Sequence, residues 1–110
     1  MRAILIDPVE RSFTEVDYDG DYKSIYYHLG CDLFDVVFTE MGDIYVDDEG
    51  LLKPNQKFFM VDNISPLAGK GLVFGRVDDD GNTTEATVTI KELEKKVKFL
   101  DVSTVMGMFE

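Results

Sequence analysis

Three consecutive carboxylates, Asp47, Asp48 and Glu49, end an apolar run and stand directly before Gly50. No other stretch of the chain looks more like a site for a cation or for acid–base chemistry. A hard cation such as calcium takes about six to eight oxygen ligands from spaced positions. Successive side chains of an extended chain point to opposite faces, so these three carboxylates cannot all converge on one ion. The pattern favours a solvated turn, with a cation-binding or catalytic role for Asp47 and Asp48 as the alternative.

A second acidic stretch, "DDDGN" (78–82), also predicts a turn. A calcium loop needs alternating acids before its glycine and a glutamate six residues after it, but Arg76 and Thr87 stand at the decisive positions. An Asp-Gly pair between two strands is typical of a hairpin. The glycines of "LAGKGLVFG" (67–75) match neither of the phosphate-binding spacings. With no standard catalytic constellation present, we expect a protein that is not an enzyme and uses no cofactor.

His28 and Cys31 are the only histidine and the only cysteine. One histidine excludes a multi-histidine metal site within one chain, and His28 falls in the last turn of an expected helix, where an imidazolium interacts favourably with the helix dipole. Cys31 follows that helix and lacks the N-terminal dipole that lowers a thiol pKa, so we expect a partly buried, inert side chain. A single cysteine also excludes an intramolecular disulfide and fits a reducing compartment.

The helix that holds His28 carries an apolar stripe. Tyr22, Ile25, Tyr26 and Leu29 recur at helical spacing within 17–30, with aspartates before them and Gly30 as the expected left-handed cap. Tyr22 and Tyr26 are expected to face the core. Tyr27 lies about a quarter-turn away and is a candidate for contact with a protein partner, or else lies half-buried at the edge of the core.

The other elements are short and separated by turn residues. Thr89 and Glu92 have the spacing of a capping box, which predicts a second helix over 90–100 with Ile90, Leu93, Val97 and Leu100 on one face. Strands are predicted over 2–7, 12–18, 32–40, 43–48, 56–62, 70–77 and, more briefly, 85–90. The first four strands form two hairpins. We expect one compact α+β domain over 1–110, with a mainly antiparallel sheet of about five to six strands, two helices and an apolar tail over 102–110.

Charge limits the range of partners. The chain has 110 residues, of which 22 are acidic and 11 basic, so the net charge is −11. Phosphate backbones and anionic membranes would repel such a surface, so neither direct nucleic-acid binding nor membrane binding is expected. The chain shows no secretory signal and no run of about 20 apolar residues, which predicts a soluble, cytoplasmic protein. The acidity serves solubility, docking onto a basic partner, or mimicry of a nucleic-acid backbone.

Several segments together resemble a known family. These are "RAILIDP", "IYVDDEGLLKPN", "PLAGKGLVFG", "DDDG" and "TIKELEKKV". In this order they resemble small uncharacterised proteins of bacteriophages, plasmids and bacteria that are catalogued only as a domain of unknown function. The resemblance runs from residue 2 to about residue 98 and is most specific over 49–55 and 67–75. The tail from Val102 belongs to this protein alone.

The resemblance implies a phage or mobile-element accessory protein that works in a bacterial cytoplasm, and it implies no particular activity. If one polar residue of the family pattern is functional, Asn55 is the candidate, with Asp47 beside it. The alternative is that Asn55 hydrogen-bonds the backbone of its own loop.

These observations predict a non-enzymatic binding module that contacts a host or phage protein with a basic surface. The contact would use a sheet edge or the tyrosine-bearing helix. One alternative is a function that depends on a small ligand or a divalent metal at the segment from Asp47 to Asn55. Another is a self-assembling structural protein, or a homo-oligomer that forms through the apolar tail or an open sheet edge.

Overall fold

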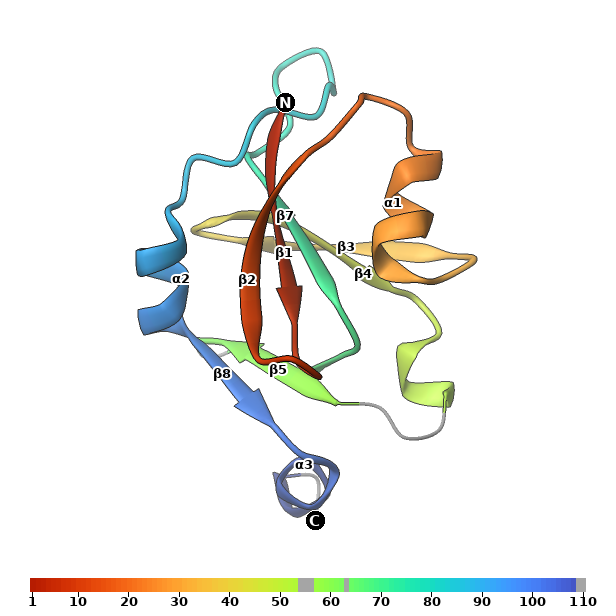
Figure 1. The fold of residues 1–110 in the computed structure, drawn as a ribbon, viewed down its shortest axis with the longest axis vertical. Coiled ribbons are helices and arrows are strands. Elements are labelled where there is room, and N and C mark those ends of the chain that lie inside the picture. The colour runs from red at the N-terminus through yellow and green to blue at the C-terminus, as the bar shows by residue number, and fades with distance from the viewer. Residues whose placement is uncertain (54–56, 63, 109–110) are drawn as a thin grey trace.

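The computed structural model describes residues 1–53, 57–62 and 64–108 (Figure 1). Within these residues the chain forms eight strands, three α-helices and one short 3-10 helix, which confirms the predicted α+β class. In chain order they are β1 (Arg2–Asp7), β2 (Ser12–Asp17), α1 (Lys23–Leu29), β3 (Phe34–Thr39), β4 (Gly42–Asp47), η1 (Gly50–Leu52), β5 (Phe58–Val61), β6 (Leu67–Ala68), β7 (Gly71–Phe74), α2 (Ile90–Lys96), β8 (Val97–Leu100) and α3 (Val102–Met108). No helix in these ranges is long and apolar enough to cross a membrane.

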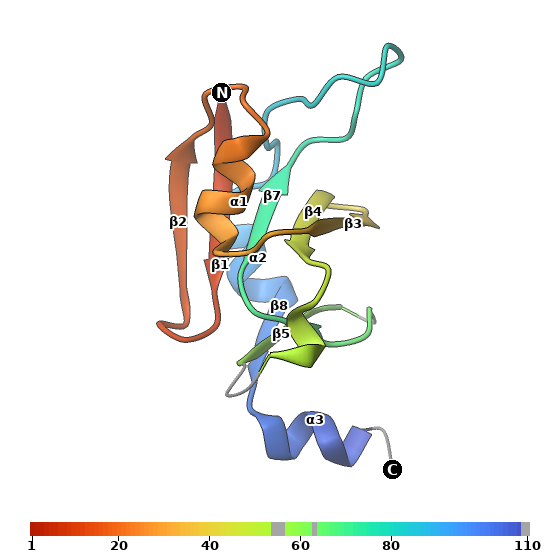
Figure 2. The ribbon, with the colours of Figure 1, turned by 90° about the vertical axis from the view of Figure 1, so that its right-hand side faces the viewer.

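Five strands form one antiparallel sheet in the order β2-β1-β7-β4-β3. The two predicted hairpins, β1–β2 and β3–β4, are confirmed. They do not pair with each other, because β7 lies between them and hydrogen-bonds to β1 and to β4. Strand β7 thus joins the two hairpins, and β2 and β3 become the outer strands of the sheet (Figure 2).

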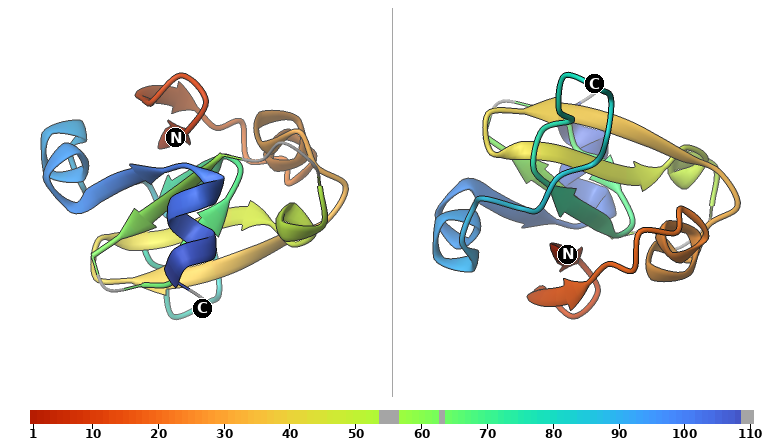
Figure 3. Two further views of the ribbon diagram at one scale, coloured as in Figure 1. Left: turned by 90° about the horizontal axis from the view of Figure 1, so that it is seen from below. Right: turned by 90° about the horizontal axis from the view of Figure 1, so that it is seen from above.

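A second sheet of three strands has the order β6-β5-β8. The predicted strand over 56–62 is therefore β5, although residue 56 lies outside the described ranges. Strand β6 lies between the predicted strands over 56–62 and 70–77, where the sequence predicted no strand; its two residues pair with Phe58 and Phe59. Helix α3 runs beneath this small sheet (Figure 3).

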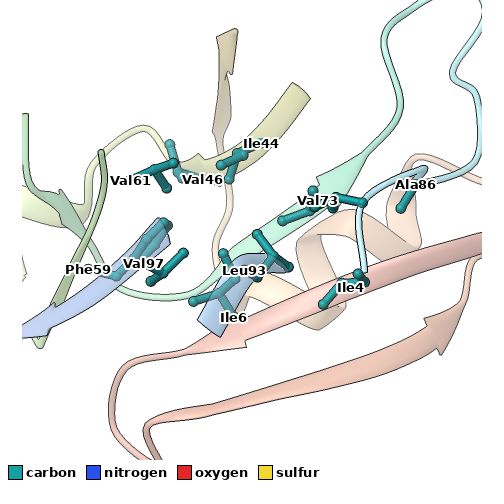
Figure 4. Packing of buried hydrophobic residues seen from close by; sticks show 11 residues of the cluster. Ile4, Ile6, Ile44, Val46, Phe59, Val61, Val73, Ala86, Leu93 and Val97 are labelled. Carbon is teal, nitrogen blue, oxygen red and sulfur yellow. The ribbon is translucent and has the colours of Figure 1, made fainter. Parts of the chain in front are cut away.

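The main core lies between the two sheets and α2. The large sheet contributes the buried side chains on one of its faces, the small sheet contributes Phe59 and Val61, and α2 contributes Leu93 (Figure 4). Burying aliphatic and aromatic side chains of this size is the main driving force of folding, about 1.5–3 kcal/mol for each large one. This core fixes the position of the small sheet against the large one.

The opposite face of the large sheet packs under α1. Ile25 and Leu29 of the helix are buried against Leu72 and Phe74 of β7. Gly30 ends the helix in the left-handed conformation, with φ 65°, as predicted. The expectation for Tyr22 was wrong: it stands at the N-cap and is 57% exposed, because the helix begins one residue later than the apolar stripe implied.

Helix α2 begins with the predicted capping box. Thr89 Oγ1 accepts a hydrogen bond from the N–H of Glu92, and the Glu92 carboxylate accepts one from the N–H of Thr89. The predicted helical end was wrong, because α2 stops at Lys96 and the chain continues as β8. Val97 pairs with Val61 of β5, so a strand partner distant in sequence overrides the local helical pattern.

The predicted strand over 85–90 does not form. The N–H of Ala86 donates to the carbonyl of Arg2, but the Arg2 guanidinium then donates to the carbonyls of Ala86 and Val88 at 2.8 and 2.9 Å. Beyond Arg2, β1 is already paired with β2 on one side and with β7 on the other, so no ladder continues along it. The apolar tail forms α3, whose Val105 packs on Phe58, Ala68 and Leu100 of the small sheet.

Candidate functional site

The acidic segment after β4 keeps its carboxylates apart, as strand alternation predicts. The side chain of Asp47 is 6% exposed, and its Oδ2 accepts a hydrogen bond from Lys53 Nζ at 2.5 Å. Its Oδ1 accepts another from the backbone N–H of Glu49 at 2.9 Å. Asp48 and Glu49 are exposed to solvent. Asp47 therefore holds the turn into η1 and neutralises Lys53.

A cavity of about 390 Å³ lies beside this ion pair. Asp47, Lys53 and Lys70 line it together with the apolar side chains of Pro8, Val9 and Leu29. In the described part of the chain, no group of three or more His, Cys, Asp or Glu side chains is arranged to hold a metal ion. The candidate Asn55 lies outside the residues that the structure describes.

Two further candidates lie near α1. Tyr27 is 84% exposed on the outer side of the helix, with its ring edge-on to His28 at 5.6 Å between centroids. Cys31 is buried, and this burial, with a smaller contribution from the charge of Asp47, raises the pKa of its thiol. A thiol with a raised pKa stays protonated at neutral pH and is a poor nucleophile. The structure thus brings Asp47 together with Lys53 but turns Asp48 and Tyr27 outward.

A surface that the sequence could not locate is the outer edge of β3. Among the described residues β3 pairs with β4 alone, so its other side is a free edge (Figure 2). The two-residue turn Glu40-Met41 joins the strands, and Thr39 and Gly42 close it. In an antiparallel pair, alternate residues bond to the neighbouring strand. Because Thr39 closes the turn, the backbone groups of Phe34, Val36 and Phe38 point away from β4 toward the free edge.

The most exposed apolar side chain on the free edge of β3 is that of Phe38. Phe38 is 72% exposed, although it lies in a strand. A hollow of about 500 Å³ on one side of it is lined by Asp43, Arg76 and Val77, and one of about 530 Å³ on the other is lined by Met41, Ile64, Asp62 and Lys96. An exposed aromatic ridge between two hollows on an unpaired strand is a typical docking surface for another chain.

Charge also sets the β3–β4 hairpin apart. Residues 24–52 contain no lysine or arginine, whereas seven acids fall in the same stretch. Asp32, Asp35 and Glu40 flank the free edge and are exposed. At close range, a strand with positive side chains is attracted to this edge and an acidic one is repelled.

One acid of the hairpin has a structural role. Asp43 is 3% exposed, and its Oδ2 accepts a hydrogen bond from the N–H of Val77 at 3.3 Å. Asp43 lies opposite Phe38 across the hairpin, and this bond ties the loop after β7 to β4 at the hollow that Phe38 also lines. The sequence signal for it is an aspartate at the start of β4, directly after Gly42 and before the apolar residues 44–46.

Comparison with known proteins agrees with the resemblance seen in the sequence. The family model described as "Domain of unknown function (DUF3846)" matches residues 1–98. A search of curated proteins and a search of solved structures found no match. The matched residues run from β1 into β8 and include the free edge of β3 and the Asp47–Lys53 pair, whereas α3 lies beyond them. The chain therefore belongs to the DUF3846 family of domains of unknown function.

Proposed function

We propose that this protein is a non-catalytic binding module, which receives an extended, basic segment of another protein along the free edge of β3. The observation that carries the proposal is the edge itself, where the backbone groups of Phe34, Val36 and Phe38 face away from β4. An added strand would pair with these groups, as in other cases of β-strand addition. The partner is a host or phage protein, in keeping with a phage or mobile-element accessory protein in a bacterial cytoplasm.

Side chains of the added strand would also find contacts. They would alternate between the two faces of the sheet, and hollows lie beside Phe38 on both sides. Phe38 is a rigid aromatic anchor, the kind of residue that dominates binding energy at protein interfaces. The excess of acids over residues 24–52 supports a partner strand that carries lysine or arginine.

Nucleic-acid mimicry receives less support. It requires the carboxylates to form one ribbon on one face. The exposed acids are instead spread over both outer strands of the large sheet, the loop 78–80 and α2, including Glu15, Asp35, Asp79 and Glu94. A scatter of this kind gives solubility and general attraction to a basic partner.

Affinity capture from bacterial lysate, with nuclease and raised salt, tests the proposal when three variants are compared. Val36→Pro removes an N–H that faces the free edge and leaves the β4 ladder intact, because proline is tolerated at such positions. Phe38→Ser removes the aromatic anchor. Tyr27→Ser is the matched control on the exposed face of α1.

The expected result is a partner that binds the parent chain and Tyr27→Ser equally. The two edge variants should weaken its binding by roughly 30-fold or more, which is the hot-spot range of about 2 kcal/mol. With the purified partner, hydrogen exchange should show slowed amides in β3. Equal binding by the edge variants, loss of binding in Tyr27→Ser, or no captured partner would each overturn the proposal.

The cavity beside Asp47 favours a second function, the binding of a small anion. Two lysines and one aspartate line it, on a chain whose net charge is −11. Titration with inorganic phosphate and with calcium, followed by melting temperature, separates an anion site from a cation site. Stabilisation by phosphate that is lost in Lys70→Ala would support the cavity as a site, and a flat response to both ions would exclude it.

A further inference from the structure

The free edge of β3 carries a carboxylate at its centre. Oδ1 of Asp35 accepts a hydrogen bond from the backbone N–H of Val36 at 2.8 Å. Val36 is the middle one of the three residues whose backbone groups face outward, and Asp35 is exposed. The carboxylate therefore occupies the place where an added strand would put a carbonyl oxygen. Pairing along the edge has to displace Asp35 first.

A second copy of the chain is the nearest competitor for this edge. If two β3 strands paired antiparallel about Val36, Phe34 of one would lie opposite Phe38 of the other and Asp35 opposite Val37. This arrangement is almost entirely apolar, which would favour association. However, it displaces both Asp35 carboxylates from their N–H partners and places them as diagonal neighbours across the new pair. Like charges so close together in a sheet are destabilising.

A partner strand that carries a lysine or arginine would find an acidic hollow beside Asp35. A hollow of about 180 Å³ lies along β3, with Asp35, Asp47 and Asp48 in its lining beside Pro66 and Leu67. Asp35 and Asp48 are exposed acids of this lining, whereas the Asp47 carboxylate is paired with Lys53, and no lysine or arginine is among the described lining residues. A cation from the partner at this point would attract the displaced Asp35 carboxylate. The Coulomb term between unit charges about 4 Å apart is favourable even near a surface.

We propose that Asp35 selects what pairs with β3: it keeps a second copy of the chain off the edge and yields to a strand that brings a lysine or arginine. The selection of the partner rests on the function proposed above, whereas the exclusion of a second copy does not. Residues of this kind, charged and set on an unpaired strand, are how natural sheets avoid edge-to-edge association. Here the same residue would also give specificity for the partner.

Two substitutions separate the hydrogen bond of Asp35 from its charge. Asp35→Asn keeps an oxygen that accepts from Val36 and loses the charge, whereas Asp35→Ala loses both. Asp32→Ala is the matched control, because it removes one exposed acid just before β3 and leaves the Asp35 bond intact. Self-association is measured by analytical ultracentrifugation over a concentration series, and the hydrogen exchange of the Val36 amide is measured by NMR in dilute solution.

We expect the parent chain and Asp32→Ala to remain monomeric with a slowed Val36 amide. Asp35→Ala should exchange this amide about tenfold faster and form dimers or larger species as its concentration rises. Asp35→Asn should associate with a slowed amide, because the charge alone has been removed. A monomeric Asp35→Ala with an unchanged Val36 amide would overturn the proposal, as would equal association of Asp32→Ala.

The partner captured through the edge of β3 tests the selection. Asp35→Lys should lose that partner, since the charge attraction becomes repulsion, while Asp32→Ala keeps it. If the partner needs β3 but binds Asp35→Lys unchanged, the selective role of Asp35 is wrong and the edge-binding function stands. If no partner needs β3 and Asp35→Ala still self-associates, the binding function is wrong and the protective role of Asp35 stands.

Discussion

Asp47 and Lys53 form an ion pair whose partners differ in burial: the side chain of Asp47 is 6% exposed and that of Lys53 is 42% exposed. The hydrogen bond from Lys53 to Asp47 raises the pKa of Lys53 above its usual value of 10.5; desolvation opposes this rise, and the charge of Asp47 adds to it. A raised lysine pKa stabilises the fold at pH values below 10.5, and this contribution is lost as the pH rises through the folded-state pKa. Because the Asp47 side chain is buried and the Lys53 side chain is partly exposed, the carboxylate depends on the ion pair more than the lysine does.

The first prediction follows from this dependence. Lys53→Met should destabilise the protein by about 1–3 kcal/mol, because the Asp47 carboxylate stays buried with only the N–H of Glu49 to donate to it. Asp47→Asn should cost less, since it leaves no buried charge. Urea unfolding at pH 7 measures both. Lys91→Met, at an exposed lysine of α2, is the control, and a similar loss in that variant would show that the effect is not specific to the ion pair.

The second prediction concerns Asp101, at the start of α3. Its carboxylate accepts hydrogen bonds from the N–H of Thr104 at 2.9 Å and from Ser103 Oγ at 3.0 Å. These bonds, the backbone one first, lower the pKa of Asp101 from 3.8 to about 2. A lowered carboxylate pKa stabilises the fold above 3.8, and the contribution is lost as the pH falls toward 2. The amide of Thr104 should therefore exchange faster as the pH is lowered through this window.

An NMR titration of the Asp101 carboxyl resonance checks the second prediction directly. Asp101→Asn serves as the control, because its amide oxygen still accepts from Thr104 and does not titrate. The exchange of Thr104 in that variant should show no step between pH 4 and pH 2 beyond the intrinsic change. A titration of Asp101 centred near 3.8 would contradict the assignment of its hydrogen bonds.

Local signals in the sequence predicted the elements well where near neighbours decide the structure. The capping box of Thr89 and Glu92, the left-handed cap at Gly30 and the two hairpins all depend on residues a few positions apart. The predictions were wrong where residues distant in the sequence determine the secondary structure. Residues 97–100 leave the helix because β5 pairs with them. Residues 85–90 form no strand because β1, which they approach at Arg2, is already paired with β2 and β7.

The same distinction applies to the candidate site. The sequence could indicate that Asp47, Asp48 and Glu49 do not converge, because strand alternation is local. It could not indicate that Lys53 covers Asp47, nor that β3 has a free edge. The free edge depends on β7 inserting between β1 and β4, and this order follows from packing over the whole chain. The sequence alone therefore does not distinguish Asp35 from the other acids, because its place on a free edge follows from the strand order.

The third prediction concerns the helix beyond the family match. Val105 of α3 is 3% exposed against Phe58, Ala68 and Leu100. Val105→Ala should cost about 2 kcal/mol, from the lost burial and the small cavity. Met106→Ala, at a position that is 59% exposed, is the control and should change the free energy of unfolding by about 0.5 kcal/mol or less. If both variants unfold like the parent chain, α3 is not docked on the small sheet in solution.

The fourth prediction compares two glycines of opposite surroundings. Gly71 of β7 lies between Ile6 and Val46, and a methyl group there would meet the Phe59 ring at 2.5 Å. Phe59 is fully buried, so its ring has no free space to move into. Gly71→Ala should therefore destabilise the protein by about 1–3 kcal/mol through overpacking of the core.

The same substitution at Gly107 of α3 should have the opposite effect on stability. A methyl group at Gly107 has no heavy atom within 4 Å, and alanine favours helix over glycine. Gly107→Ala should stabilise the protein by about 0.4–1 kcal/mol, chiefly by restricting the unfolded chain. Urea midpoints of the two variants against the parent chain measure both effects. A neutral Gly71→Ala would mean that Phe59 does not cover β7, and the packing of the small sheet on the large one would then be wrong.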